Sequence, residues 1–563
     1  MKSKFLLVAA IAVATVIDRA GRAQETTKDA PAGKAPELVL RVADYASAPI
    51  TGTPDGLGNN AGSLARINFL REEPAPAARF FVNDLNGPLY ILDRATKKWT
   101  QYLDFNGRAP HTGLFERLPT ENGLASGFIS FEFDPDYAHN GRFYTIHLED
   151  LLIEGSLLPH NAAVPGLVVT GYTPTAPILT PGDADHEAVL IEWTDTNIAN
   201  TTFEGTAREL LRIRLYSRIH PVGDLIFNPV ARRGDPDWRV LYVACGDGGS
   251  GEQRTDVRLN PQRLDTMAGK ILRIIPDLNE HVDSSTTSGN GRYRIPEDNP
   301  FVSIEGARKE IWAYGLRNPH RLNWDVDPVN PANNHLIAAV IGLRTWETVV
   351  IIHKGGNYGY SQREGTETLL PDNTRRAVSG TDEIPVYVTD SITHGTVVPR
   401  YPVLEYGHTA SGGDAIAGGF VYRGRTVPEL QGKYVFGDIS TGHVWYAELK
   451  EMIAADDTDP RTLAEAHEVH LWWDDPSDTP DRGGQRYPTL SPIVKAAYHA
   501  RGGRHPELPG HSTLASSGRV DLRFALDRSG ELYLLSKSDG MIRVVTGAGA
   551  PVTTTGDHPR DDD

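Results

Sequence analysis

The chain has 563 residues, a formal net charge of −17 and a single cysteine, and 39% of its residues are hydrophobic. The 55 glycines and 39 prolines are scattered rather than clustered, which favours many short strands and tight turns over a helical bundle. The acidic balance argues against binding to nucleic acid or to an anionic membrane surface, and one cysteine excludes an intrachain disulfide.

The first 23 residues have the pattern of a secretory signal peptide. Two lysines precede an apolar run from Phe5 to Ile17, and Gly21-Arg22-Ala23 offers small residues for cleavage. We therefore expect an exported protein, periplasmic or extracellular, with no membrane span after cleavage; an uncleaved anchor is the alternative. Residues 24–60, which begin with a stretch rich in Ala, Pro, Lys and Glu, are expected to form an N-terminal extension.

A short strand flanked by Gly, Asn or Asp turns recurs along the rest of the chain. Its copies carry a tyrosine, at positions Tyr90, Tyr144, Tyr242, Tyr434 and Tyr533. Two more strand pairs are expected near 311–325 and 336–352, and long loops near 150–205, 365–400 and 452–518. Repeated units without an internal linker predict an all-β fold, a β-propeller with long inserted loops over residues 61–548, and an array of β-sandwiches is the alternative. Residues 549–563 are expected to be a disordered tail.

The segment from His220 to Asp247 is the first candidate for chemistry. His220 precedes a proline and a Gly-Asp turn, so its ring is expected at the entrance of a strand, where an imidazole can act as a base near neutral pH. The strand through Tyr242 then leads to Asp247 among glycines, and an Asp beside a His can fix its tautomer. Asp247 could instead form a turn or bind a structural cation. Cys245, inside that strand, is interpreted as a small buried residue.

A second candidate lies at Arg317 and Asn318. Gly315 releases the backbone just before them, and Pro319 forces Asn318 into an extended conformation. The pair would thus present a cationic fork of donors beside an amide at a strand end. A structural turn that joins two strands is the alternative interpretation.

In number and order, these motifs resemble the glucose/sorbosone dehydrogenase family. The resemblance covers roughly residues 115–545 and rests on these pieces in chain order: His220 with Gly223, Leu225, Phe227 and Pro229; Leu241-Tyr242-Val243 with Gly246-Asp247-Gly248-Gly249; Gly269-Lys270-Ile271-Leu272-Arg273-Ile274; Ile295-Pro296-Glu297-Asp298-Asn299-Pro300-Phe301; Gly315-Leu316-Arg317-Asn318-Pro319; Lys354-Gly355-Gly356-Asn357-Tyr358-Gly359; Gly418-Gly419-Phe420-Val421-Tyr422-Arg423-Gly424; and Gly437-Asp438. It implies a six-bladed β-propeller of the kind found in soluble dehydrogenases that depend on pyrroloquinoline quinone (PQQ).

The resemblance also implies roles for single residues. His220 would remove the proton from a sugar or polyol hydroxyl with support from Asp247, while hydride passes to the quinone. PQQ would be contacted by Arg317, Asn318 and His320. Main-chain carbonyls at Gly342 and Leu343 would hold calcium. Because the chain has no Cys-x-x-Cys-His haem motif, electrons would pass to an external acceptor.

The chain departs from the family near Gly437-Asp438. There the dehydrogenases place cationic side chains that grip the PQQ carboxylates, whereas this chain has Ser440-Thr441-Gly442-His443. One alternative is therefore a catalytically inactive propeller that serves as a secreted carbohydrate- or protein-binding module. A calcium-dependent hydrolase is another, although no Gly-x-Ser-x-Gly elbow occurs. Basic side chains that converge on the pocket holding His220 would favour the dehydrogenase.

Overall fold

The computed structural model describes residues 38–53, 62–120, 126–327, 329–409, 411–474, 484–510 and 518–549. The signal peptide expected at 1–23 lies outside these ranges, and so does the tail expected at 549–563 except for its first residue. In the described ranges, no helix has the length and apolar character needed to cross a membrane.

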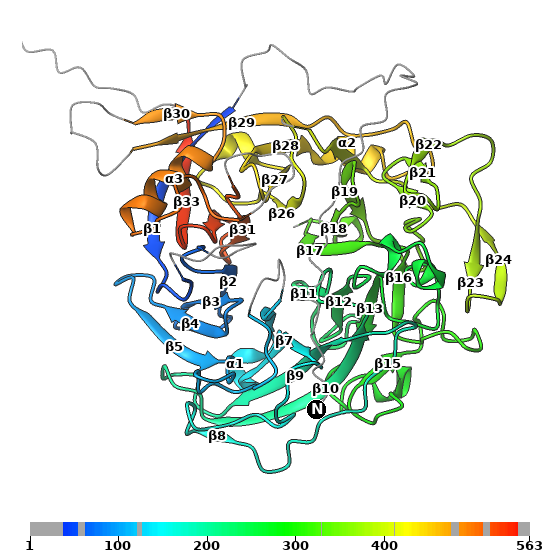
Figure 1. The fold of residues 1–563 in the computed structure, drawn as a ribbon, viewed down its shortest axis with the longest axis horizontal. Helices are drawn as coiled ribbons and strands as arrows, with labels where there is room; N and C mark the ends of the chain where they lie inside the picture. The colour runs from blue at the N-terminus through cyan, green and yellow to red at the C-terminus, as the bar shows by residue number, and fades with distance from the viewer. Residues whose placement is uncertain are drawn as a thin grey trace, which may run out of the picture. The chain divides into compact units, whose positions relative to one another are not determined.

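Most of the described chain folds into small antiparallel sheets (Figure 1). The first sheet is β2 (Ile67–Glu72), β3 (Phe80–Asp84), β4 (Pro88–Leu92) and β5 (Trp99–Asp104). The second is β6 (Phe128–Phe133), β7 (Arg142–Asp150), β9 (His186–Asp195) and β10 (Gly205–Leu215), with β8 (Leu167–Val168) at its edge. The third is β11 (Val222–Phe227), β12 (Leu241–Cys245), β13 (Lys270–Ile274) and β16 (Ile311–Tyr314). The fourth is β17 (Asn318–Asp325), β18 (His335–Ile341), β19 (Trp346–Ile351) and β25 (Leu404–Gly407).

A nine-stranded sheet joins the two ends of the described chain. Its strands are β26 (Ile416–Val421), β27 (Lys433–Asp438), β28 (Val444–Glu448), β29 (His467–Trp473), β1 (Leu38–Ser47), β33 (Met541–Ala548), β32 (Leu532–Ser536) and β31 (Leu522–Leu526), with β30 (Gln485–Tyr487) paired to β29. Smaller sheets contain β14 (Ser285–Thr287) and β15 (Arg294–Pro296); β20 (Arg363–Glu364), β21 (Glu367–Leu369) and β22 (Arg375–Ala377); and β23 (Ile384–Tyr387) and β24 (Thr393–Val397). The helices are α1 (Tyr137–Asn140), α2 (Leu449–Ala454) and α3 (Ser491–Ala500).

The nine-stranded sheet contains two units, one that begins with β26 and one that begins with β31. Counted in this way, the first strand of each unit contacts the first strand of the next one. β2 contacts β6, β6 contacts β11, β11 contacts β17, β17 contacts β26, β26 contacts β31, and β31 contacts β2 again. These contacts close into a ring, and the remaining strands of each unit extend outward from it (Figure 1). A mostly β chain arranged in this way is consistent with a propeller-like fold.

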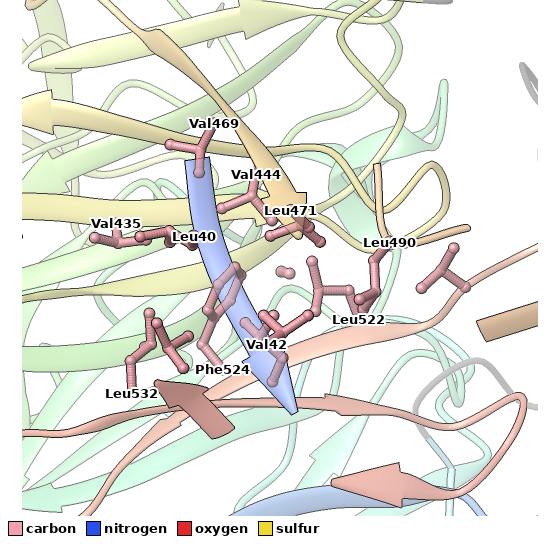
Figure 2. Packing of buried hydrophobic residues seen from close by; sticks show 14 of the residues in the cluster. Leu40, Val42, Val435, Val444, Val469, Leu471, Leu490, Leu522, Phe524 and Leu532 are labelled. Atoms are coloured by element: carbon pink, nitrogen blue, oxygen red, sulfur yellow. The ribbon is translucent and has the colours of Figure 1, made fainter. Parts of the chain in front are cut away.

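The folded region begins earlier than the sequence analysis expects. Leu38–Ser47 lies within residues 24–60, which the sequence predicts to be an extension, but it forms strand β1. This strand pairs antiparallel with β33 and parallel with β29. Alternate residues of β1 point into an apolar cluster, and Figure 2 shows Leu40 and Val42 among side chains from β28, β29 and β31. Pairing with a strand some 500 positions away provides partners that the local composition does not reveal.

Replacing Leu40 by alanine is expected to lower the free energy of unfolding by about 2–5 kcal/mol, because Leu40 is almost fully buried and a cavity would remain. Chemical denaturation measures this change. Leu152→Ala is the control, since that side chain is 80% exposed and its loss should have little effect. Equal effects of the two substitutions would show that β1 does not belong to the core.

Two of the expected long loops are shorter than predicted. The segment expected at 150–205 contains β9, which pairs with β7 and β10, and the one at 452–518 contains β29. Both are regular members of their sheets. The segment at 365–400 does form an insertion between β19 and β25, with only small sheets of its own. Cys245 is fully buried in β12, as predicted.

Candidate functional site

His220 lies just before β11, at the strand entrance where the sequence places it. Its backbone has φ 48°, in the left-handed region that side chains other than glycine rarely adopt. Its ring Nδ1 is 2.8 Å from Oδ1 of Asp247, which is fully buried just after the end of β12. The predicted His-Asp pair is therefore formed.

Glycine at position 246 allows the two segments to approach this closely. The Gly246 N–H donates to the carbonyl of Pro221 at 3.0 Å, and the Gly248 N–H donates to the carbonyl of His220 at 3.0 Å. A Cβ on Gly246 would lie 2.3 Å from the His220 carbonyl oxygen, so any other residue would push the histidine segment away.

Hydrogen bonds keep the Asp247 carboxylate ionised. It accepts the N–H groups of Gly249 at 2.8 Å and Gly251 at 2.9 Å in addition to the His220 ring. Burial is the largest influence and by itself raises the pKa, but the His220 hydrogen bond and the charges of His220 and Arg317 together hold the pKa of Asp247 below its ordinary value. An ionised Asp247 selects the tautomer with the proton on Nδ1 and leaves Nε2 of His220 as a base.

Arg317 reaches the same place from the start of β17. Its carbonyl accepts the Asp247 N–H at 2.8 Å, and its Nη2 forms an ion pair with Oε1 of Glu252. That same Oε1 lies 3.8 Å from Nε2 of His220. Although burial opposes the charge, Glu252 raises the pKa of the Arg317 guanidinium above its ordinary value. His220 and Arg317, distant in sequence, thus meet at one carboxylate.

Glu252 was not predicted as a site residue. It ends a short 3₁₀ helix, Ser250–Glu252, which begins three residues after Asp247. Glycines at 248, 249 and 251 let the chain turn back over Asp247. This glycine-rich run was the available signal, because a chain that turns so tightly places the next side chains beside the carboxylate.

A pocket adjoins Arg317. It is lined by residues of β18, β19 and β20 and of the segments between strands, among them Arg317, Gly342, Tyr358, Tyr360 and Arg363. The Tyr360 hydroxyl is buried there and has no hydrogen-bond partner in the described part of the chain. Burial, together with the Asp247 charge, raises its pKa well above the ordinary value, so this hydroxyl is a neutral donor facing the pocket.

The predicted calcium ligands are arranged differently from the expectation. The Gly342 carbonyl accepts a hydrogen bond from Nη1 of Arg317, and the neighbouring Ile341 carbonyl accepts from the same nitrogen at 3.2 Å. Leu343 is half-buried beside them. Among the residues that the structure describes, no group of three or more His, Cys, Asp or Glu side chains is placed to hold a metal ion.

A second, narrow pocket lies among the inner strands. We call it the channel pocket, and it is lined by Asn68, Leu85, Ile129, Pro221, Gly223, Asn318, His320, Arg321, Arg523 and Lys537. Two of the predicted cofactor residues, Asn318 and His320, line the channel pocket, whereas Arg317 lines the first pocket. Pro221 and Asn318 adjoin His220 and Arg317 in the chain, so the channel pocket begins next to the His-Asp pair.

The three long cationic side chains of the channel pocket were missed by the sequence analysis. The resemblance to the family places such cations near Thr441. The turn at Thr441 instead hydrogen-bonds the Asp438 carboxylate, whose Oδ1 accepts the N–H of Thr441 at 2.8 Å. The basic groups come from other strands, with Arg321 on β17, Arg523 on β31 and Lys537 just after β32. His220 itself lines neither pocket, so these basic side chains do not converge on a pocket that holds His220.

Comparison with known proteins links this site to a family. Residues 217–468 match the family described as Glucose / Sorbosone dehydrogenase. The match includes His220, Asp247, Glu252 and Arg317.

Curated proteins that are similar to this chain have names that refer to different functions. HIPL1 protein of Arabidopsis thaliana is 28% identical over 67% of this chain and 52% of its own length, so the chain spans about half of that relative. Hedgehog-interacting protein of Homo sapiens is 24% identical over 64% of this chain and 39% of its own length. Aldose sugar dehydrogenase YliI of Escherichia coli K12 is 31% identical, but over 27% of this chain and 34% of its own length.

A crystal structure of glucose dehydrogenase is similar in fold. It covers 91% of this chain and 99% of its own with a TM-score of 0.50 and 16% sequence identity. At that identity the likeness concerns the fold and not the chemistry.

Proposed function

We propose, from the premise that residues 217–468 of this chain belong to the glucose/sorbosone dehydrogenase family, that the protein oxidises a hydroxyl group of a sugar or polyol with PQQ as cofactor. The ring of inner strands would then be a six-bladed β-propeller that extends beyond the expected range of 61–548, because β1 (Leu38–Ser47) would complete its last blade. The site would face the periplasm or the extracellular space, and an external acceptor would take the electrons.

One observation carries the proposal. Nδ1 of His220 is bonded at 2.8 Å to a buried, ionised aspartate, and its Nε2 faces the carboxylate that Arg317 also holds. A base with a fixed tautomer beside a permanent cation suits proton removal from a hydroxyl while negative charge develops nearby. His220 would take the hydroxyl proton on Nε2, and Asp247 would stabilise the resulting imidazolium.

The residues present fit PQQ. It carries three carboxylates, and the chain offers cations in two places: Arg317 in the first pocket, and Arg321, Arg523 and Lys537 in the channel pocket. The partnerless Tyr360 hydroxyl and Nε2 of His320 are buried polar atoms that a polar ligand could satisfy. When bound, PQQ would supply the hydride acceptor, while Arg317 would orient and polarise the reacting end.

Calcium at Gly342 and Leu343 does not fit the same arrangement. A guanidinium already donates to the Gly342 carbonyl, and a second cation on that oxygen would be repelled by the first. We therefore assign no step to calcium.

Calcium added to the protein without PQQ is expected to leave the melting temperature unchanged, because the Gly342 carbonyl is engaged by Arg317. Differential scanning calorimetry with and without chelator measures this, with magnesium as the control. A saturable rise in melting temperature with calcium alone would contradict the expectation.

Reconstitution tests the proposed activity. Purified protein is titrated with PQQ, and reduction of a redox dye is followed with a panel of aldoses, polyols and lactones. Sugar-dependent dye reduction that requires PQQ supports the proposal. Saturable binding of a sugar or protein without dye reduction would favour a binding module, the alternative suggested by the name of one relative, Hedgehog-interacting protein. Lactone hydrolysis without PQQ would favour a hydrolase.

A further inference from the structure

The channel pocket is built from five of the inner strands at the ends nearest His220. Its wall takes Asn68 from β2, Ile129 from β6, Gly223 from β11, Arg321 from β17 and Arg523 from β31. Lys537 joins them from the turn after β32. Because these positions come from strands far apart in sequence, the pocket exists only in the folded ring.

Three cationic side chains are concentrated in this pocket, and none of them forms a direct ion pair with a carboxylate of the described residues. The residues Arg321, Arg523 and Lys537 are only 6%, 3% and 2% exposed. Within the described part of the chain, no carboxylate lies within ion-pair distance of any of the three. The charges of Asp521 and Asp224 act on these cations from a greater distance, but Asp521 is itself paired with Arg519 at 3.3 Å and Asp224 with Arg71 at 2.7 Å. Buried ions that lack a counter-charge are costly, usually by several kcal/mol each.

The partners that these arginines do have are neutral. Arg321 donates to the Asn68 side-chain oxygen at 3.0 Å, and Arg523 donates to the same oxygen at 3.2 Å. Arg321 also donates to the carbonyl of His320 at 2.9 Å, and Arg523 to that of Leu522 at 2.6 Å. One amide oxygen thus lies between two guanidinium groups, an arrangement that holds both in place without neutralising either.

His320 adds an unsatisfied polar atom to the pocket. Its residue is 7% exposed, and its Nε2 has no hydrogen-bond partner among the described residues. Burial and the charges of Arg321, Arg523 and Lys537 lower the pKa of His320 well below its ordinary value. Burial and the Arg523 charge likewise lower the pKa of Lys537. A bound negative charge would raise the pKa of both His320 and Lys537.

We infer that the channel pocket binds a compact oxyanion group, held by Arg321, Arg523 and Lys537 with an imidazole N–H of His320. A free phosphate, sulfate or small dicarboxylate offers this group, and so does a carboxylate of a larger ligand such as PQQ. The inference does not depend on the proposed oxidation, because it follows from the charges and the pocket alone.

Thermal unfolding tests the inference with defined probes. The wild-type protein is melted in chloride and, at matched ionic strength, in sulfate, phosphate or malonate, and separately with PQQ. We expect a rise in melting temperature that grows with the concentration of the binding anion. Calorimetric titration of the same anions into the folded protein measures binding directly.

Lys537→Met is the informative variant. In chloride it should melt higher than the wild type, because it removes a buried ammonium that lies among like charges. It should also lose the response to the anion. Lys495→Met is the matched control, since Lys495 pairs with Glu507 at 2.6 Å far from the pocket, and it should respond as the wild type does.

The outcomes separate the two sources of the anion. A response to sulfate, phosphate or malonate that Lys537→Met loses identifies a site for a free oxyanion. A response to PQQ alone, lost in the same variant, identifies a site for a carboxylate of the larger ligand. If no probe raises the melting temperature or binds in the calorimeter, or if Lys537→Met responds as fully as the wild type, the inference is wrong.

Discussion

Replacing His220 by alanine is expected to lower the rate of sugar oxidation by about 100- to 10,000-fold, while the affinity for PQQ changes little. The reason is that Nε2 of His220 would take the hydroxyl proton, and the 2.8 Å bond between Nδ1 and Asp247 fixes the tautomer in which Nε2 is the acceptor. Steady-state dye reduction gives the rate, and a PQQ titration gives the affinity. A variant that retains the full rate would show that His220 is not the base.

The control is another histidine paired with a carboxylate. His353 has its Nε2 2.6 Å from Oδ2 of Asp456 and lines neither pocket. His353→Ala should therefore oxidise sugars at the wild-type rate. Equal losses in the two variants would mean that the effect comes from disturbed folding and not from a missing base.

Replacing Arg317 by alanine is expected to weaken PQQ binding and to lower the turnover rate by about 100- to 1,000-fold. Arg317 is the cation nearest the His-Asp pair, and its guanidinium connects Glu252 to the carbonyl of Gly342. Its loss removes a donor for the reacting end of the cofactor and leaves Glu252 without its ion partner. Both affinity and rate are measured at saturating sugar.

Arg208→Ala is the matched control, since Arg208 pairs with Glu192 at 2.9 Å on the outer strands of another sheet. It should leave PQQ affinity and rate unchanged. If Arg317→Ala binds PQQ as tightly as this control does, Arg317 does not belong to the cofactor site.

The strands were predictable because their patterns are local. A turn, an aromatic and β-branched run and a second turn mark β7, β12, β27 and β32, where Tyr144, Tyr242, Tyr434 and Tyr533 are buried on the second strand of their units. Tyr90 occupies a different position in its unit, because it lies on β4, the third strand of its sheet. A repeat detected by one residue type therefore finds strands but does not fix their position in each unit.

Strand β1 shows what local composition conceals. Its neighbours before residue 38 are rich in Ala, Pro and Lys, and this led to the assignment of an extension. A signal was nevertheless present, since Leu38, Leu40 and Val42 alternate with more exposed residues. The pairing with β33 depends on closure of the ring, which no short window of sequence contains.

The site was only partly predictable for a similar reason. His220 lies just before β11 and Asp247 just after β12, and these two strands pair in one sheet, so the approach of the two residues follows from the order of strands along the chain. Arg321 and Arg523 come together only because β17 and β31 both line the ring. The cations were consequently sought at Thr441, on the wrong strands.

Equilibrium binding of PQQ, followed by the absorbance of the cofactor in the absence of sugar, tests the central claim most directly. The account predicts saturable binding at one site per chain, retained by His220→Ala and weakened in Arg317→Ala. Absence of saturable binding, or binding that is unchanged in Arg317→Ala, would contradict it.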